Sequence, residues 1–402
     1  MKPIQLGGIA YVKERNKRLI LRCVKEEGPV SRSEIADRLQ ISKPTVSALV
    51  EELLREGWVQ ESGIGHSGLQ GGRRPIELLF NNRAAYVIGV DIGGTKVRTG
   101  ICDLSGKVVA VDEFPTQTHL LSGILTALEL SAAKLMRELG LVPENILGMG
   151  IGAPGMTDVK RGIVLDAPSL GWKDYELKKQ AEAIFPWPVV IDNDVNVAVI
   201  GEQWIGAAKG LRNVVLISIG TGIGCGLIIH GELYRGSTWA AGEIGYMITD
   251  KTKSQSENLP AYHKGYGFLD RYTGGPSIVQ KMEAELKSKP GHFLSSSPFT
   301  AKDVFHAAQQ GDETALGVVH EVVDHIGFAI ANMISIINPE VVLLGGGVSK
   351  SADWFMPRIK EIITEYASVS APVKRTAFAE NLGVVGAVSL VLREIESALK
   401  VM

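Results

Sequence analysis

The sequence predicts an α/β chain with an N-terminal winged helix-turn-helix followed by a two-lobed α/β body. Two short amphipathic helical patterns separated by a tight turn open the chain. A glycine-rich stretch between two strand patterns follows them. From residue 85 the pattern changes to strands, glycine-rich turns and helices, and a similar order recurs in the second half. We therefore expect a DNA-binding domain at 1–82 and a second domain at 83–402.

Composition excludes several classes of protein. The 402 residues are 45% hydrophobic and 21% charged, which is ordinary for a globular protein and excludes collagen-like, disordered and disulfide-scaffold chains. The three cysteines, Cys23, Cys102 and Cys225, are widely separated and predict no disulfide framework. The apolar stretches are far shorter than the ~20 residues of a membrane span, and the N-terminus lacks a signal-peptide pattern. We therefore expect a cytoplasmic protein without membrane association.

Charge is unevenly distributed along the chain. Residues 1–80 hold 13 Lys and Arg against 10 Asp and Glu, whereas the remainder is acidic. The net charge of the whole chain is −2. This distribution is consistent with an N-terminal module that faces an acidic partner.

Local capping signals define the N-terminal helices. The first helix is predicted over 13–27, where apolar residues recur at helical spacing. A second helix begins after Ser31, because Ser31 and Glu34 have the spacing of a capping box. Ser42 is the expected cap of the third helix, and a proline is tolerated in its first turn because the N–H groups there have no helical partner.

Two helices joined by a tight turn are typical of helix-turn-helix domains, in which the first residues of the second helix meet base edges in the major groove. Residues 58–60 and 76–80 are predicted strands that flank a glycine-rich loop and form a wing. An extended Gly-Arg-Arg-Pro segment in this loop suits insertion into a narrow minor groove. The partner is then an operator of double-stranded DNA; a three-helix interaction module with a solvated basic face is the alternative. The candidate DNA contacts are Ser42, Lys43, Thr45, Ser47, Arg73 and Arg74.

The body is predicted to contain two sets of strands, and a glycine-rich turn connects the first two strands of each set. The two sets predict two lobes, and ligands usually bind in the cleft between such lobes. Turns are expected at 91–96 and 221–224, between strand pairs. Strands are predicted over 87–90, 97–102, 108–112, 146–151, 189–191, 214–219, 225–230 and 341–344, and helices over 122–140, over 314–337 and from residue 382.

Three glycine-rich turns have the chemistry of a nucleotide site. Residues 93–95 lack bulk and present backbone N–H groups to phosphate oxygens, and Thr95 adds a hydroxyl. Asp91 is placed to hold Mg²⁺ through water. Residues 220–224 offer a second phosphate site, and 345–347 allow a flat nucleobase to lie against backbone. The structural alternative is that all three are only tight turns.

An Asp-Asn-Asp sequence at 192–194 ends one strand and begins a helix. One of its carboxylates is expected to cap that helix, or Asp194 is a general base for a sugar hydroxyl while Asn193 orients the sugar. Glu243 lies in a glycine-flanked loop and is a further candidate to bind hydroxyl groups.

Taken in order, these motifs resemble the ROK family (repressors, open reading frames and sugar kinases), in the winged helix-turn-helix regulator branch with the xylose and N-acetylglucosamine repressors. The resemblance covers about residue 13 to the C-terminus. It implies an actin/hexokinase-like (ribonuclease H-like) fold, with lobe one at about 83–205 plus the C-terminal helix and lobe two at about 206–380. The matching segments are 91–96, 152–155, 192–196, 220–226, 242–245, 338–340 and 345–347.

The resemblance also implies ATP and Mg²⁺ as cofactors, assembly into dimers or tetramers, and roles for individual residues. Asp194 takes the place of the catalytic base. The implied sugar-binding residues are Asn193, Asp194, Gly155, Ser169, Glu243, Tyr246 and Asp270. The implied nucleotide-binding residues are Asp91, Gly93, Gly94, Thr95, Lys96, Thr221, Gly222, Gly346 and Gly347.

The chain departs from the family pattern near the sugar. Tyr246 stands where family members commonly have a zinc-binding histidine, and segment 264–270 contains no cysteine. Because a structural zinc site needs three or four nitrogen or sulfur ligands, we predict no zinc. Ser169 and Asp270 replace an expected asparagine and glutamate. The sugar therefore stays open among xylose, glucose and N-acetylated sugars.

Two functions follow from these observations. The first is a sugar-responsive repressor of carbohydrate-utilisation genes, in which a sugar in the body changes the affinity of a dimer for DNA. The second is an ATP-dependent sugar kinase, in which Asp194 deprotonates a sugar hydroxyl. An inactive dimeric scaffold is a third. The DNA-binding module and the altered sugar residues favour the repressor, whereas the intact Asp91 motif and Asp194 favour retained nucleotide chemistry.

Overall fold

A computed structural model describes residues 9–64, 75–120, 123–254 and 267–401. The chain divides into two compact units. The first unit, called the module here, contains residues 1–86 and 103–105; the second, called the body, contains residues 87–102 and 106–402.

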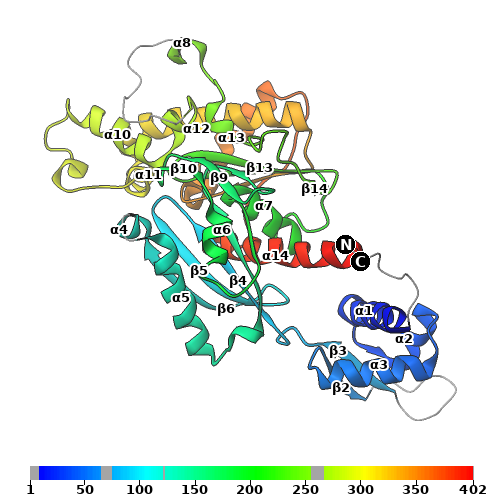
Figure 1. The fold of residues 1–402 in the computed structure, drawn as a ribbon. Coiled ribbons are helices and arrows are strands. Elements are labelled where there is room, and N and C mark those ends of the chain that lie inside the picture. The colour runs from blue at the N-terminus through cyan, green and yellow to red at the C-terminus, as the bar shows by residue number, and fades with distance from the viewer. Residues whose placement is uncertain (1–8, 65–74, 121–122, 255–266, 402) are drawn as a thin grey trace. The chain divides into compact units, whose positions relative to one another are not determined.

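The described residues of the module form three helices and a small antiparallel sheet (Figure 1). The helices are α1 (Ile9–Glu27), α2 (Arg32–Leu39) and α3 (Lys43–Arg55). The strands are β1 (Val30–Ser31), β3 (Ile76–Phe80) and β2 (Val59–Ile64), in that order across the sheet. The predicted helix-turn-helix and the paired strands of the wing are thus confirmed, whereas the wing residues 65–74, including Arg73 and Arg74, lie outside the described residues.

Short-range hydrogen bonds begin both helices of the helix-turn-helix. The backbone N–H of Glu34 donates to Ser31 Oγ over 3.3 Å, and Ser31 N–H donates to Glu34 Oε2 over 2.8 Å. These two bonds form the predicted capping box. The side chain of Ser42 accepts from the N–H of Thr45 and caps α3, as predicted. The first residue of α3 is therefore held at a fixed place beside the turn.

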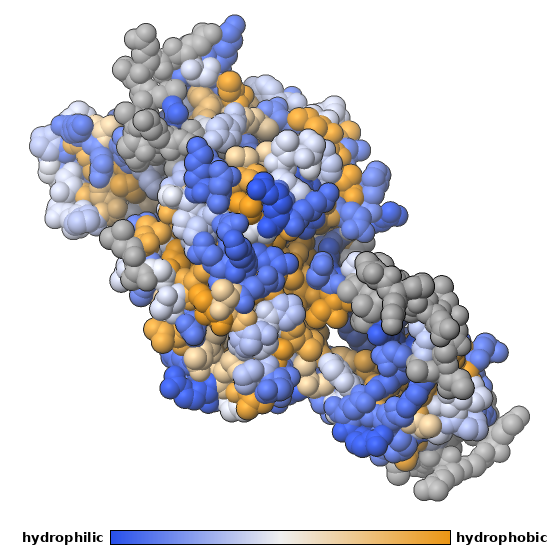
Figure 2. Space-filling view, viewed as in Figure 1, coloured by the Kyte–Doolittle hydropathy of each residue, from blue (hydrophilic) through white to orange (hydrophobic). Residues whose placement is uncertain are grey.

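One hydrophobic cluster holds the module together. It joins apolar faces of all three helices to the central strand β3, while hydrophilic side chains cover much of the module in Figure 2. Burial of this surface stabilises the domain by roughly 25 cal/mol per Å² of apolar area. The cluster includes Ile20, Val24, Val30, Ile35, Val46, Leu49, Val50, Leu53 and Leu78.

The first lobe of the body is built on a five-stranded sheet in the order β11-β7-β4-β5-β6. Its strands are β4 (Tyr86–Ile92), β5 (Lys96–Asp103), β6 (Val108–Pro115), β7 (Ile146–Ala153) and β11 (Val189–Asn193). A smaller sheet consists of β10 (Trp172–Tyr175), β9 (Ile163–Ala167) and β8 (Met156–Asp158). The associated helices are α4 (Thr116–His119), α5 (Ile124–Leu139), α6 (Leu177–Glu182), α7 (Asp194–Ile205) and α14 (Leu382–Val401).

The second lobe has a sheet in the order β14-β13-β12-β15-β16. Its strands are β12 (Val214–Ile219), β13 (Ile223–Ile229), β14 (Glu232–Leu233), β15 (Val341–Gly345) and β16 (Val373–Arg375). Its helices are α8 (Lys251–Ser254), α9 (Asp270–Thr273), α10 (Gly275–Leu286), α11 (Ala301–Gln309), α12 (Glu313–Ile337) and α13 (Ala352–Tyr366).

Helix α7 connects the two sheets of the body. It contacts β7 and β11 of the first lobe, β12 and β13 of the second, and the C-terminal helix α14. Glycines permit these close approaches: a Cβ at Gly152 of β7 would lie 3.3 Å from Asp194 Cα, and one at Gly226 of β13 would lie 2.7 Å from Val195 O. The first turn of α7 is therefore fixed by both halves of the body.

The structure corrects several predicted boundaries. Helix α1 begins at Ile9 rather than at 13. The sequence pattern missed this start because Tyr11 and Val12 are exposed and add nothing to the buried helical pattern. Strand β4 continues through Ile92, so Asp91 lies in the strand and not in the turn. Strand β13 begins at Ile223, which pairs with Ile219, and the second glycine-rich turn is therefore confined to residues 220–222.

Within the described part of the chain, one helix is long and apolar enough to cross a membrane. This helix is α12, and 67% of its most apolar window is buried inside the protein. Most of its buried apolar residues belong to a hydrophobic cluster of the second lobe. A helix buried in the core of a globular protein can have the same length and apolar composition as a membrane-spanning helix, so these two properties alone are weak evidence for a membrane span.

Candidate functional site

The start of α3 presents polar side chains to solvent. Ser42, Lys43 and Ser47 are exposed, whereas Thr45 is half-buried and its hydroxyl lies 2.7 Å from Ser42 Oγ. A hollow of about 400 Å³ lies over this end of the helix. Its lining includes Arg32, Lys43 and Ser47. The four predicted DNA contacts that the structure describes thus lie together at the start of α3. Two of them, Ser42 and Thr45, also form a hydrogen bond with each other.

Lys43 differs in its pairing from other cations of the module. Arg18, Arg22, Arg32 and Arg38 each form an ion pair with a glutamate. Among the residues that the structure describes, Lys43 forms no such pair. Its charge is therefore available to an anionic partner at the exposed start of α3, where the helix dipole also favours negative charge.

In the body, the first glycine-rich turn connects β4 to β5. Gly93 N–H donates to Lys96 O over 2.9 Å, and Thr116 Oγ1 donates to Gly93 O over 2.7 Å. A Cβ at Gly94 would lie 3.1 Å from Thr221 Oγ1 and 3.3 Å from Ser169 Cβ. The turn therefore approaches residues of both lobes at a point where a side chain would be crowded.

Charged groups flank this turn. Burial raises the pKa of Asp91 to about 6, against the opposing influence of the Arg98 and Lys96 charges. The carboxyl group packs against α14, where a Cβ at Gly383 would lie 2.3 Å from Asp91 Cγ. Lys96 is exposed and forms an ion pair of 2.9 Å with Glu113. Thr95 is exposed beside it.

The other two glycine-rich turns differ in the space around them. At 220–222, Gly220 N–H donates to Gly222 O over 2.8 Å and closes the turn that carries Thr221. Gly346 has a φ of +81°, and a Cβ there would lie 2.3 Å from Ile219 O. Gly347 has open space where its Cβ would be, which is the room that a flat ligand against backbone requires.

Asn193 caps α7, and both the oxygen and the nitrogen of its side-chain amide form hydrogen bonds. Its Oδ1 accepts from the N–H groups of Val195 and Asn196, over 2.9 and 3.0 Å. Its Nδ2 donates to Gly155 O over 3.0 Å. The expectation that a carboxylate caps this helix is therefore corrected: the amide of Asn193 does so, and it also fixes the loop at Gly155.

Asp194 is the first residue of α7. Burial raises the pKa of Asp194 to about 7, and the charges of Asp91 and Glu243 raise it further, whereas the N–H of Val195 lowers it by donating to Oδ1 over 2.9 Å. A carboxyl group with a pKa near neutrality is suited to accept a proton from a hydroxyl. The geometry thus gives Asp194 the chemistry of a general base.

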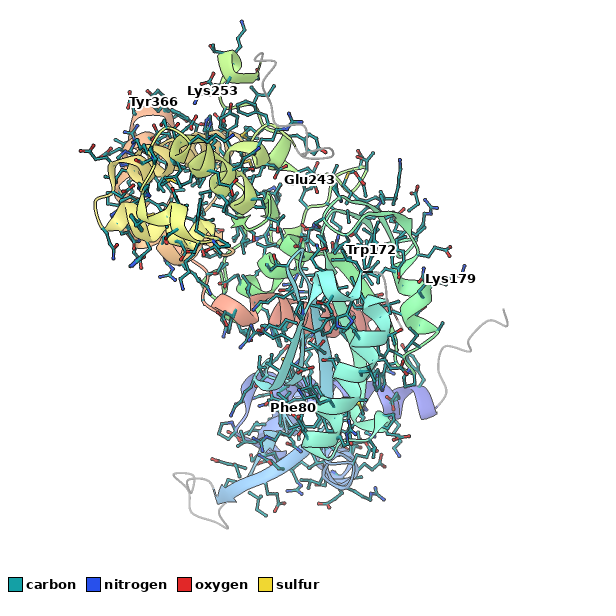
Figure 3. All side chains as sticks on the ribbon, turned by 90° about the vertical axis from the view of Figure 1, so that its left-hand side faces the viewer. Phe80, Trp172, Lys179, Glu243, Lys253 and Tyr366 are labelled. Carbon is teal, nitrogen blue, oxygen red and sulfur yellow. The ribbon has the colours of Figure 1, made fainter. Side chains whose placement is uncertain are left out.

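Glu243 lies between the helices of the second lobe and the strands of the first (Figure 3). Burial raises its pKa, and the nearby charges of Asp270 and Asp166 add to the effect. Asp166 is a residue that sequence reasoning missed, because it lies in β9, a strand that the sequence did not predict, and in none of the motifs. A Cβ at Gly155 would lie 2.0 Å from Asp166 O, which places this strand against the Gly155 loop.

Asp270 and Tyr246 are placed differently from Glu243. Asp270 Oδ1 accepts from Ile223 N–H over 2.8 Å, and Oδ2 accepts from Gly267 N–H over 2.9 Å. Asp270 therefore braces the backbone next to the Thr221 turn. Tyr246 is 55% exposed, and burial of part of its ring raises the pKa of its hydroxyl.

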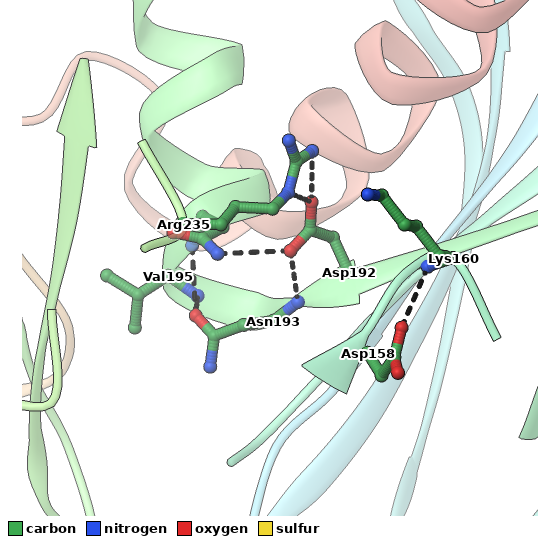
Figure 4. A network of polar contacts seen from close by, with 7 residues as sticks. Asp158, Lys160, Asp192, Asn193, Val195 and Arg235 are labelled. Atoms are coloured by element: carbon green, nitrogen blue, oxygen red, sulfur yellow. Dashed lines mark hydrogen bonds and ion pairs between the residues drawn. The ribbon is translucent and has the colours of Figure 1, made fainter. Parts of the chain in front are cut away.

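Asp192 is the second residue that sequence reasoning missed. It is fully buried, and Arg235 donates to its Oδ2 from Nη2 over 2.6 Å and from Nε over 2.8 Å (Figure 4). A carboxylate near the end of a buried strand needs a partner, and this requirement is the signal that would have identified it. Asp192 thus links the Asp194 loop to a segment of the second lobe.

The described residues contain no group of three or more His, Cys, Asp or Glu side chains arranged to hold a metal ion. Cys23, Cys102 and Cys225 are all buried, and no disulfide joins them in the described part of the chain.

Comparisons with known proteins agree with this architecture. The ROK family model matches residues 87–394, and a family model for a winged helix-turn-helix DNA-binding domain matches residues 13–60. The chain is 28% identical to a xylose repressor from Caldicellulosiruptor bescii, over 98% of this chain and 99% of that protein. It is 32% identical to a glucokinase from Halalkalibacterium halodurans, over 78% of this chain and 96% of that protein.

Among solved structures, the body resembles a ROK family glucokinase from Streptomyces griseus in complex with glucose and AMPPNP. The TM-score is 0.67 and the sequence identity 29%, over 77% of this chain and all of that one. The two glucokinases match 77% and 78% of this chain, whereas the xylose repressor matches 98%. The chain therefore belongs to the ROK family and carries a winged helix-turn-helix of the DNA-binding type at its N-terminus.

Proposed function

We propose that this chain is a sugar-responsive transcriptional repressor that binds DNA through residues 1–82 and a sugar through residues 83–402. The observation that carries this proposal is the joining of an exposed, capped recognition helix to a ROK body in one chain. A xylose repressor is similar over 98% of this chain, which includes both parts. D-xylose is therefore the first sugar to test, with D-glucose and N-acetyl-D-glucosamine beside it.

DNA binding is tested at Lys43. Full-length protein is used to select duplexes from a random double-stranded library, and binding to the selected duplex is measured at several salt concentrations. Because Lys43 forms no ion pair among the described residues, Lys43→Ala is expected to weaken binding and to reduce the salt slope by about 1. Arg22→Ala, which removes a cation paired with Glu26 on α1, is the matched control. Equal DNA binding by wild type and Lys43→Ala would contradict the proposal that the start of α3 contacts DNA.

For the sugar, the groups that support binding are Asp194 and Glu243, two half-buried carboxyl groups that can accept hydrogen bonds from hydroxyls. Gly155, Ser169 and Asn193 complete the proposed contact region. Tyr246 and Asp270 flank it, one at the surface and one bonded to backbone. A bound sugar shifts the equilibrium between two states of the protein only if it binds one of them more tightly.

A nucleoside triphosphate fits the glycine-rich turns. The backbone of 93–95 and 220–222 would hold its phosphates, and the open space at Gly347 would accept the base. When bound with Mg²⁺, the nucleotide supplies a transferable phosphoryl group. Asp91 is the carboxylate that would hold Mg²⁺ through water, and Lys96 would have to leave Glu113 to reach a phosphate.

Sugar kinase activity is the second candidate function. Asp194 favours it, because its pKa of about 7 suits a general base, and a glucokinase is 32% identical over the body. A coupled ATP assay with common hexoses and pentoses decides between the two functions. Robust turnover that Asp194→Asn abolishes, together with the absence of operator binding, would establish a kinase instead of a repressor.

We further propose that the protein acts in the cytoplasm as a homo-oligomer. Helix-turn-helix proteins read two-fold symmetric operators as dimers, because each protomer supplies one recognition helix. Light scattering on purified protein measures the oligomeric state. A monomer that binds its selected duplex with full affinity would contradict this part of the proposal.

A further inference from the structure

The segment from Tyr234 to Glu243, called the strap here, leads from β14 to the proposed sugar site. Both of its ends are fixed on β13. Tyr234 N–H donates to Leu227 O over 2.8 Å, and Gly242 O accepts from Cys225 N–H over 2.9 Å. Gly242 has a φ of +92°, and a Cβ there would lie 1.8 Å from Cys225 O. The end of the strap that carries Glu243 therefore lies directly against the strand.

Between these ends, the strap reaches across to the first lobe. Arg235 donates from Nε and Nη2 to Asp192 Oδ2, over 2.8 and 2.6 Å. The Asp192 side chain has no exposed surface, whereas 27% of the Arg235 side chain is exposed. An ion pair with this geometry and burial is much less weakened by water than a surface pair.

The other carboxylate oxygen of Asp192 faces the first turn of α7. Oδ1 accepts from Asn193 N–H over 2.8 Å and from Asn196 Nδ2 over 3.0 Å. All four lone-pair positions of the carboxylate are therefore occupied, two by the strap and two by the residues around Asp194. Figure 4 shows this arrangement, with Asp192 between Arg235 and the start of α7. Movement of either partner thus disturbs the other.

A second contact holds the strap to the first lobe. The ammonium group of Lys160, in the turn after β8, lies 5.9 Å from the centre of the Trp239 ring, within the range of a cation–π interaction. Trp239 has a φ of +66°, a conformation that is strained for a bulky side chain. Such strain persists only where surrounding contacts hold the residue, and it is concentrated at sites that clamp ligands.

We propose that Arg235 and Asp192 are positioning residues that hold Glu243 and Asp194 in the relative geometry that binds a sugar. The proposal rests on the proposed sugar-binding function and adds to it the contact that couples the two lobes at the site. Neither residue needs to touch the sugar, because each acts through a segment that carries a candidate ligand group. The charge of Glu243 contributes to the raised pKa of Asp194, which is consistent with two carboxyl groups that lie near each other.

The first measurement needs no ligand. Hydrogen exchange of full-length protein is followed by mass spectrometry in peptides that cover 190–200 and 234–244. Arg235→Met is expected to increase exchange at least several-fold in both peptides, whereas Arg235→Lys retains part of the protection. Arg358→Met is the matched control, because Arg358 forms a similar two-bond pair with Asp324 on the surface of the second lobe. Unchanged exchange in the 190–200 peptide would overturn the proposal.

The second measurement is calorimetric titration with D-xylose, D-glucose and N-acetyl-D-glucosamine. Arg235→Met and Asp192→Asn are each expected to weaken binding of the cognate sugar at least tenfold, and the double variant to bind no more weakly than the worse single variant. Arg358→Met is expected to bind as wild type does. Fully additive losses, or wild-type affinity in both single variants, would contradict a shared positioning role. Failure of wild type to bind any of these sugars would contradict the proposed function instead, while the exchange measurement still decides the role of the pair.

Discussion

Replacing Asp194 with asparagine is expected to stabilise the protein at neutral and alkaline pH. Burial and the charges of Asp91 and Glu243 raise the pKa of Asp194 from 3.8 to about 7. The native state therefore binds a proton that the unfolded state releases, and wild-type stability falls as pH rises from about 4 through 7. Asp194→Asn removes this ionisation, while the amide oxygen of the variant can still accept from Val195 N–H.

The magnitude follows from the size of the shift. About three pKa units at ~1.36 kcal/mol each give an upper limit of roughly 4 kcal/mol above pH 7. Because Asp194 is only half-buried, solvent screening reduces the expected gain to about 2 kcal/mol. Urea unfolding at pH 4, 5, 6, 7 and 8, followed by circular dichroism, measures the difference between variant and wild type.

The pattern across pH is the decisive feature of this measurement. The advantage of Asp194→Asn should be near zero at about pH 4, grow through pH 7 and then level off. Asp37→Asn, which removes an exposed carboxylate from the module, controls for the general effect of one negative charge. A difference that does not change with pH, or a variant less stable than wild type at pH 8, would refute the electrostatic account of this site.

Two glycines give further predictions of opposite kind. Gly242→Ala places a Cβ 1.8 Å from Cys225 O at a φ of +92°, so we expect thermal unfolding to show a loss of at least about 2 kcal/mol; a neutral result would mean that the strap is not held against β13. Gly347→Ala meets open space, so its stability should stay within about 0.5 kcal/mol of wild type. The same substitution should weaken binding of AMPPNP at least tenfold by calorimetry, and unchanged binding would exclude this backbone from the nucleotide site.

Features encoded within a few residues were predictable from the sequence. Ser31 and Glu34 are three residues apart, and Ser42 caps the helix that directly follows it, so hydrogen bonding within one turn determines these helix starts. The glycine-rich turns were also identified, but their limits were not. At β13 the pairing of Ile223 with Ile219 extended the strand into residues that the sequence had assigned to the turn. Pairing between the strands gives these backbone N–H and C=O groups their hydrogen-bond partners, which the local sequence pattern does not reveal.

Long-range contacts were beyond sequence reasoning. Asp192 and Arg235 are 43 residues apart, and no periodicity connects a strand end in one lobe to a segment of the other. The capping role of Asn193 was missed for a related reason: asparagine and aspartate are similarly good caps, so the sequence left the choice between neighbouring residues open. Asp166 gave no signal, because its proximity to Glu243 arises only when the small sheet folds against the Gly155 loop.

The central claim is that a sugar bound to the body controls DNA binding by the module. Fluorescence anisotropy of full-length protein on its selected duplex, titrated with D-xylose, D-glucose and N-acetyl-D-glucosamine, tests this claim most directly. The account predicts that one of these sugars raises the dissociation constant for DNA at least tenfold, and that Asp194→Asn abolishes this response while sugar-free DNA binding is retained. A sugar that binds the body by calorimetry but leaves the dissociation constant unchanged would contradict it.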